Sequence, residues 1–74
     1  MKKLKNVKRR REPYNKLKGF FVQNNIKQQD VAKLLEKSKS ALNQNLNGTG
    51  GDFSVNEVRI LCKNYNISAD EYFL

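Results

Sequence analysis

Apolar residues recur with a helical period in the segment that follows residue 12. Four of them lie at offsets 0, 3, 6 and 7 and share one helix face: Tyr14, Leu17, Phe20 and Phe21. Pro13 suits the first turn of a helix, because its φ is already helical and its missing N–H needs no partner there. The pattern predicts a helix over residues 13–24, after which Ile26 returns to the core.

Two shorter helical segments come next in the chain. Residues 28–35 place Val31 and Leu35 one turn apart, and the small Ala32 would let another helix approach closely. Ser38 suits the N-cap of a third helix over residues 39–46, whose apolar positions are Leu42 and Leu46. This helix has a thin apolar seam and an outer face of hydrogen-bonding side chains: Lys39, Ser40, Asn43, Gln44 and Asn47.

The rest of the chain predicts a loop and two further helical elements. Three glycines fall within residues 47–52, which predicts a loop. Ser54 and Glu57 have the spacing of a capping box, which predicts a helix from there to about Tyr65. Its expected buried face is Val55, Val58, Leu61, Cys62 and Tyr65. Ser68 and Glu71 repeat the spacing and predict a short final helix, so the fold class is all-α with four to five short helices.

Positive charge is concentrated at the start of the chain. The protein has 15 basic and 7 acidic residues, a net charge of +8, of which residues 1–12 carry +6. The basic residues there are Lys2, Lys3, Lys5, Lys8, Arg9, Arg10 and Arg11. Because like charges repel and bury little apolar surface, residues 1–12 are expected to be a flexible basic arm on a domain of residues 13–74. No apolar stretch follows the arm, so it is not expected to be a signal peptide.

The composition gives little support for catalysis. The chain has no histidine, its only cysteine, Cys62, falls in a helix-core pattern, and its carboxylates have local explanations as caps and surface charges. We expect no enzyme activity, no metal, no cofactor and no small-molecule substrate. A lone cysteine and the lack of about 20 consecutive apolar residues predict a cytoplasmic protein with no membrane association.

Residues 27–48 resemble, without a gap, the helix-turn-helix of the lambda-repressor-like family, which includes phage Cro proteins and repressors. The resemblance rests on a combination of positions: Gln28, Ala32, Ser38, Leu42 and the pair Asn47-Gly48. It extends over roughly residues 14–74. The family usually has a glycine and then an aliphatic residue in the turn, where this chain has Glu36 and Lys37, and a threonine where it has Lys27.

The resemblance implies roles for the polar residues. Gln28 would contact a DNA phosphate, while Lys39, Ser40 and Gln44 would reach base edges, with Asn43 beside them as a fourth candidate base contact. Lysine can donate to guanine, glutamine can pair with adenine, and serine can adapt to either. Helix starts and the loop after the third helix offer further phosphate contacts, at Ser38, Asn47 and Thr49.

These features predict a sequence-specific double-stranded DNA-binding transcriptional regulator. We expect a short phage or prophage Cro-like repressor that binds its operator as a homodimer and acts by occupancy, at the nucleoid of a bacterial host. Three alternatives stay open: the antitoxin of a toxin–antitoxin pair, a protein-interaction module on the same scaffold, and an RNA-binding arm on an inert globule.

Overall fold

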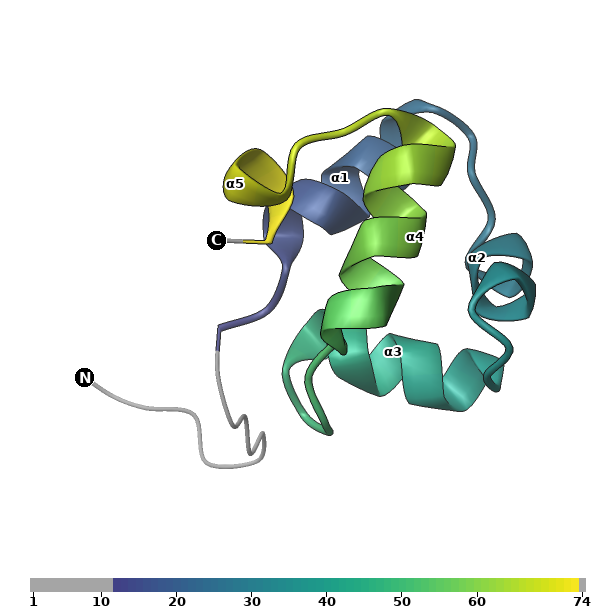
Figure 1. Cartoon of the computed structure of the whole chain (residues 1–74). Helices are drawn as coiled ribbons and strands as arrows, with labels where there is room; N and C mark the ends of the chain where they lie inside the picture. Colours follow the sequence, from purple (N-terminus) through teal and green to yellow (C-terminus); the bar gives the residue numbers. More distant parts are fainter. Residues whose placement is uncertain (1–11, 74) are drawn as a thin grey trace.

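Five helices make up most of the chain that the computed structural model describes, which is residues 12–73 (Figure 1). They are α1 (Asn15–Gln23), α2 (Gln28–Leu34), α3 (Lys39–Asn47), α4 (Val55–Tyr65) and α5 (Ala69–Tyr72). No strand occurs between residues 12 and 73. The all-α fold with four to five short helices is therefore confirmed, whereas the basic residues predicted to form the arm lie outside the described residues.

Backbone hydrogen bonds explain the bounds of α1. Helix α1 begins two residues later than predicted, because the Tyr14 N–H donates to the carbonyl of Leu46 over 2.9 Å and holds Tyr14 outside the helix. Asn25 then takes a left-handed conformation with φ of 56°, and the Ile26 N–H donates back to Phe21. The chain thereby reverses within two residues and returns an apolar side chain to the core.

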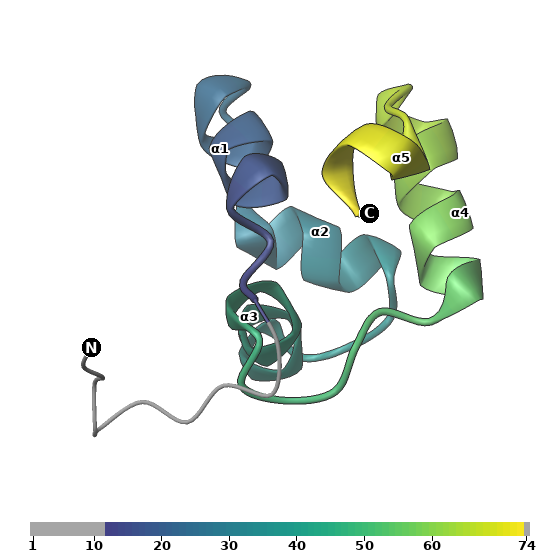
Figure 2. The ribbon, with the colours of Figure 1, turned by 90° about the vertical axis from the view of Figure 1, so that its left-hand side faces the viewer.

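One apolar core lies between the helices. Its buried residues are Leu17, Phe21, Val31, Ala32, Leu35, Leu42, Leu46, Phe53 and Leu61. The predicted inward positions of α2 and α3 are all among them. Figures 1 and 2 show α3 along one edge of the molecule, with α1, α2 and α4 all on the same side of it. The arrangement leaves one long side of α3 uncovered by other helices of the described chain.

Aromatic side chains fill the space where α1, α4 and α5 meet. Phe20 packs edge-on against Tyr65 and Tyr72, with ring centroids 6.2 and 5.3 Å apart. Tyr14 and Phe53 contact Phe73 in the same way. These contacts place the last residues of the described chain against the body of the domain, as packing residues rather than as platforms for stacking bases.

Two local predictions were wrong. Val55 was expected in the buried face of α4 but is 68% exposed, because it is the first residue of the helix and lies away from Leu61, the buried residue of α4. Ser68 makes no side-chain capping bond at the start of α5. Glu71 instead approaches Lys16 of α1 at 3.9 Å, so the residue at the expected third position of the box is used elsewhere.

The contrast between two valines provides a test of this core. We expect Val31→Ala to lower the free energy of unfolding by about 2 kcal/mol, because two buried methyl groups are lost and a cavity forms. Val55→Ala removes the same atoms from an exposed position and should change it by less than about 0.5 kcal/mol. Urea unfolding of both variants measures the difference, and equal losses would contradict the burial described above.

Candidate nucleic-acid interface

A tight turn joins α2 to α3 and sets the direction in which α3 points. The Lys37 N–H donates to the carbonyl of Ala32 over 3.0 Å, and Glu36 takes a left-handed conformation with φ of 58°. Glycine adopts this conformation without strain, and glutamate does so at some cost. Ser38 then caps α3, its hydroxyl accepting the Ala41 N–H at 3.0 Å. The predicted helix, turn and capped helix are therefore all present.

The outward face of α3 consists of polar side chains. Lys39, Ser40, Asn43 and Gln44 are all exposed, and all four were predicted as base contacts. Residues one turn apart along a helix share a face, so these positions form one continuous surface. Leu42 and Leu46 lie on the opposite side in the core. The structure thus brings the four predicted side chains together.

The predicted phosphate contacts lie at the borders of this face. Ser38 and Thr49 are exposed, whereas Gln28 and Asn47 are half-buried. Asn43 connects two of them, because its amide accepts from Asn47 and donates to Gln28. Lys18 of α1, which the sequence analysis did not single out, donates to Asn47.

The loop after α3 folds back against the helix. Gly48 ends α3 with φ of 75°, which favours glycine, and the N–H groups of Thr49 and Gly50 both donate to the carbonyl of Gln44. A Cβ atom at Gly50 would lie 2.7 Å from Oε1 and 2.8 Å from Cβ of Gln44. Only glycine lets the loop approach so closely, so the loop backbone borders the space that the Gln44 side chain occupies.

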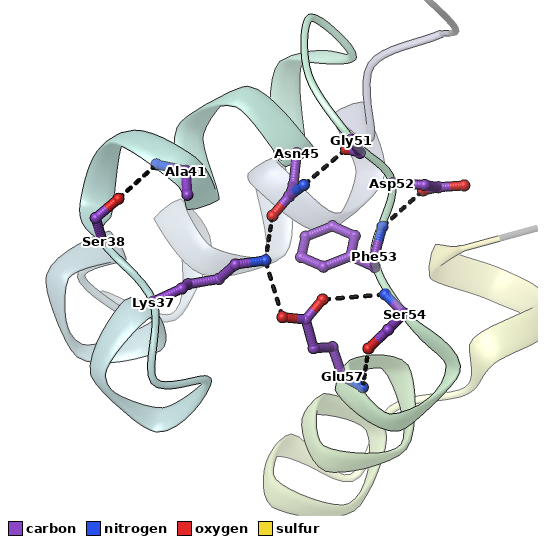
Figure 3. Close-up of polar contacts among 9 residues, drawn as sticks. All are labelled: Lys37, Ser38, Ala41, Asn45, Gly51, Asp52, Phe53, Ser54 and Glu57. Atoms are coloured by element: carbon purple, nitrogen blue, oxygen red, sulfur yellow. Dashed lines mark hydrogen bonds and ion pairs between the residues drawn. The ribbon is translucent and has the colours of Figure 1, made fainter.

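A polar cluster behind α3 fixes the helix to the rest of the fold (Figure 3). The Lys37 ammonium donates to Asn45 Oδ1 at 2.5 Å and lies 2.8 Å from Glu57 Oε2. The Asn45 amide in turn donates to the carbonyl of Gly51 at 2.6 Å, and Lys37 lies 5.6 Å from the centre of the Phe53 ring. We call Lys37, Asn45, Phe53 and Glu57 the Lys37 cluster. It joins the turn, α3, the loop and α4.

Sequence analysis missed the main members of the Lys37 cluster. The sequence predicts only a polar turn at Lys37 and gives no local signal for Asn45, which is 6% exposed. The one signal was that Lys37 stands where the resembling family has an aliphatic side chain. Nothing local in the sequence points from there to Glu57, although the capping box of Glu57 with Ser54 was predicted and is confirmed.

The environment of Glu57 lowers its pKa. Partial burial acts to raise the pKa, but the hydrogen bonds from Lys37 and from the Ser54 N–H, with the charge of Lys37, outweigh it. Glu57 is therefore ionised at neutral pH. Burial raises the pKa of the Cys62 thiol, which disfavours the reactive thiolate.

Two further features of the described chain bear on function. Among residues 12–73, no group of three or more histidine, cysteine or acidic side chains could hold a metal ion. None of the helices there is long and apolar enough to cross a membrane.

The pKa of Glu57 predicts how stability depends on pH. A carboxylate with a lowered pKa stabilises the fold above its unfolded value, near 4.5, and this contribution is lost as the pH falls through the lowered value. We expect Glu57→Gln to cost about 1–2 kcal/mol at pH 7, since glutamine can keep the capping box but not the charge.

The same variant should lose little relative to the wild type well below pH 4.5, where the wild-type carboxylate is itself protonated. Urea unfolding at several pH values measures the difference. Glu71→Gln is the matched control, because that side chain is 55% exposed, and it should change stability little at any pH. A Glu57→Gln effect that does not vary with pH would contradict an ionised Glu57 paired with Lys37.

Comparison with known proteins agrees with this geometry. A family model described as helix-turn-helix matches residues 17–72, which include all five helices except the first two residues of α1. Searches of curated proteins and of solved structures gave no significant match. Because the family model covers most of the chain and includes the capped α2–α3 unit, the protein belongs to the lambda-repressor-like helix-turn-helix family of DNA-binding transcription regulators.

Proposed function

We propose that this DNA-binding regulator is a phage or prophage Cro-like repressor that blocks transcription by occupying its operator. It would act in the cytoplasm of a bacterial host, at the nucleoid. The observation that carries the proposal is the exposed polar face of α3, held outward by a capped turn and backed by buried leucines. Such a face can enter the major groove of duplex DNA, where base pairs present distinct donor and acceptor patterns.

Three side chains of α3 are the proposed base contacts. Lys39 would donate to guanine, Gln44 would pair with adenine, and Ser40 would accept or donate according to the base; Asn43 lies beside them. Around this face, Gln28, Ser38, Asn47 and Thr49 would contact phosphates and set the register. Because the Thr49 N–H already donates to the backbone carbonyl of Gln44, the hydroxyl of Thr49 is the group that would bind a phosphate oxygen.

A second copy of the chain would complete the binding site. Each bidentate base contact discriminates by about 1–3 kcal/mol, so two or three of them give limited specificity. A two-fold homodimer would double the contacts and require half-sites about 34–36 Å apart, one turn of the DNA. A palindromic consensus among sites selected from random duplex DNA would support both the operator and the dimer.

Removing the proposed base contacts should reduce specificity. We expect Lys39→Ala and Gln44→Ala each to weaken operator binding by roughly 5- to 150-fold, the equivalent of about 1–3 kcal/mol, with less effect on unrelated DNA. Fluorescence anisotropy with operator and scrambled duplexes measures the ratio.

The matched controls are Lys63→Ala and Gln23→Ala, which remove exposed side chains of the same kinds outside the α2–α3 unit. Both should bind the operator like the wild type. If the α3 variants kept full operator binding and selectivity, α3 would not be the element that contacts bases, and the scaffold would serve another partner.

The basic segment at the start of the chain should provide affinity without specificity. Residues 13–74 carry a net charge of only +2, so most of the attraction to phosphates is assigned to residues 2–11. We expect deletion of residues 2–11 to weaken binding to all duplexes and to reduce the salt dependence by as much as about five units of log K per log salt, if about six phosphates are contacted. Binding to operator and scrambled DNA across a salt series tests this. Complete loss of operator selectivity on deletion would instead assign recognition to the arm.

A further inference from the structure

Four polar side chains form a hydrogen-bonded chain across the proposed DNA-binding surface. The Lys18 ammonium donates to Asn47 Oδ1 at 2.5 Å, and Asn47 Nδ2 donates to Asn43 Oδ1 at 2.9 Å. Asn43 Nδ2 then donates to Gln28 Oε1 in a longer contact of 3.5 Å. The chain runs from α1 across α3 to the first residue of α2, so it joins three helices.

The hydrogen bonds of this chain of side chains all run in one donor-to-acceptor direction, which Lys18 sets. An ammonium group can only donate, whereas a side-chain amide has one accepting oxygen and one donating nitrogen. Once Lys18 engages the oxygen of Asn47, the nitrogen of Asn47 is the end that turns to Asn43. The same choice repeats at Asn43, so each amide is fixed in one of its two orientations. At Gln28 the oxygen is engaged by Asn43 and Nε2 is the remaining end.

The orientation of the Gln28 amide matters because phosphate oxygens only accept hydrogen bonds. With Oε1 held by Asn43, Gln28 has its donating Nε2 for a phosphate, and no acceptor for that group is found among residues 12–73. A rotated amide would offer Oε1 to the phosphate and repel it. Lys18 and Asn47 are half-buried, so the start of the chain is partly shielded from competing water.

We propose that Lys18 and Asn43 are positioning residues that fix the amide of Gln28 so that its Nε2 donates to a DNA phosphate. The proposal rests on the proposed function and narrows the role of Asn43. Since both ends of its amide are engaged within the protein, Asn43 serves a contact to the DNA backbone, and Lys39, Ser40 and Gln44 are left to contact bases.

The free protein gives a first test that needs no DNA. In Lys18→Met the chain loses its only obligate donor, so the side-chain amide NMR signals of Asn47, Asn43 and Gln28 should all shift. Lys18→Arg keeps a donor-only group and should preserve most of the wild-type signals. Lys16→Met is the matched control, because it removes a lysine from the same helix whose carboxylate partner is Glu71 of α5, and it should leave those signals in place. Unchanged amide signals of Asn43 and Gln28 in Lys18→Met would overturn the proposal.

A double-mutant cycle tests the effect on DNA binding. We expect Asn43→Ala to weaken binding by roughly 2- to 10-fold, the range for one net hydrogen bond, and by the same factor for the operator and each single-base variant of it. In a Gln28→Ala background, the same substitution should cause no further loss. In the Gln28→Ala background, Lys18→Met should weaken DNA binding only by the amount that follows from losing one positive charge. Lys16→Met measures that amount.

Additive losses in the cycle, or a loss of preference at one base pair in Asn43→Ala, would overturn the positioning role. Asn43 would then act alone or contact a base. These outcomes are distinct from failure of the proposed function, which would appear as a wild-type protein that selects no sequence from random duplex DNA. Asn43 is exposed, and the helix content and melting temperature of each variant identify any that fails to fold.

Discussion

The ammonium group of Lys37 connects the turn before α3 to the helix itself and to the start of α4, and the direction of α3 depends on this connection. A helix held only by Leu42 and Leu46 could roll about its apolar seam, because hydrophobic contact is not directional. The Lys37 cluster adds directional bonds on the inner side, through Asn45 to the Gly51 carbonyl and through Glu57 to the capping box of α4. The polar face is consequently presented at one fixed angle.

An aliphatic side chain at position 37 could fill this space without burying a charge. A partly buried ion pair has a desolvation cost that its attraction only partly offsets. Lys37 is therefore not expected to make the fold more stable than an aliphatic residue would. Its stem can still pack over the Phe53 ring, while the ammonium satisfies a buried amide and a carboxylate. Compared with an aliphatic side chain at position 37, Lys37 replaces an apolar contact with a hydrogen bond and an ion pair of defined geometry. These bonds fix the orientation of α3 more than they raise the stability of the fold.

Local signals in the sequence predicted most of the fold, and tertiary contacts explain the misses. The Ser54 and Glu57 capping box formed as predicted, but the same spacing at Ser68 and Glu71 did not form one, and Glu71 lies near Lys16 of α1. For the candidate site, helical periodicity identified the polar face of α3 correctly. It could not identify Lys18 or Glu57 as partners of that region, since each meets its partner only after the helices have packed.

The asparagines of α3 lie on two sides of the helix, one facing outward and the other facing the rest of the fold. Asn43 and Asn47 lie one turn apart on the outer side and belong to the hydrogen-bonded chain that begins at Lys18, whereas Asn45 lies between them in sequence and belongs to the Lys37 cluster. Both systems begin at a lysine, so two of the positive charges near the polar face are engaged in ordering amides. Under the proposed function, Lys39 is the exposed lysine of α3 itself that would contact DNA, and a domain with so little remaining charge would depend on the basic residues at the start of the sequence for attraction to phosphates. Affinity and specificity are thereby assigned to different parts of the chain.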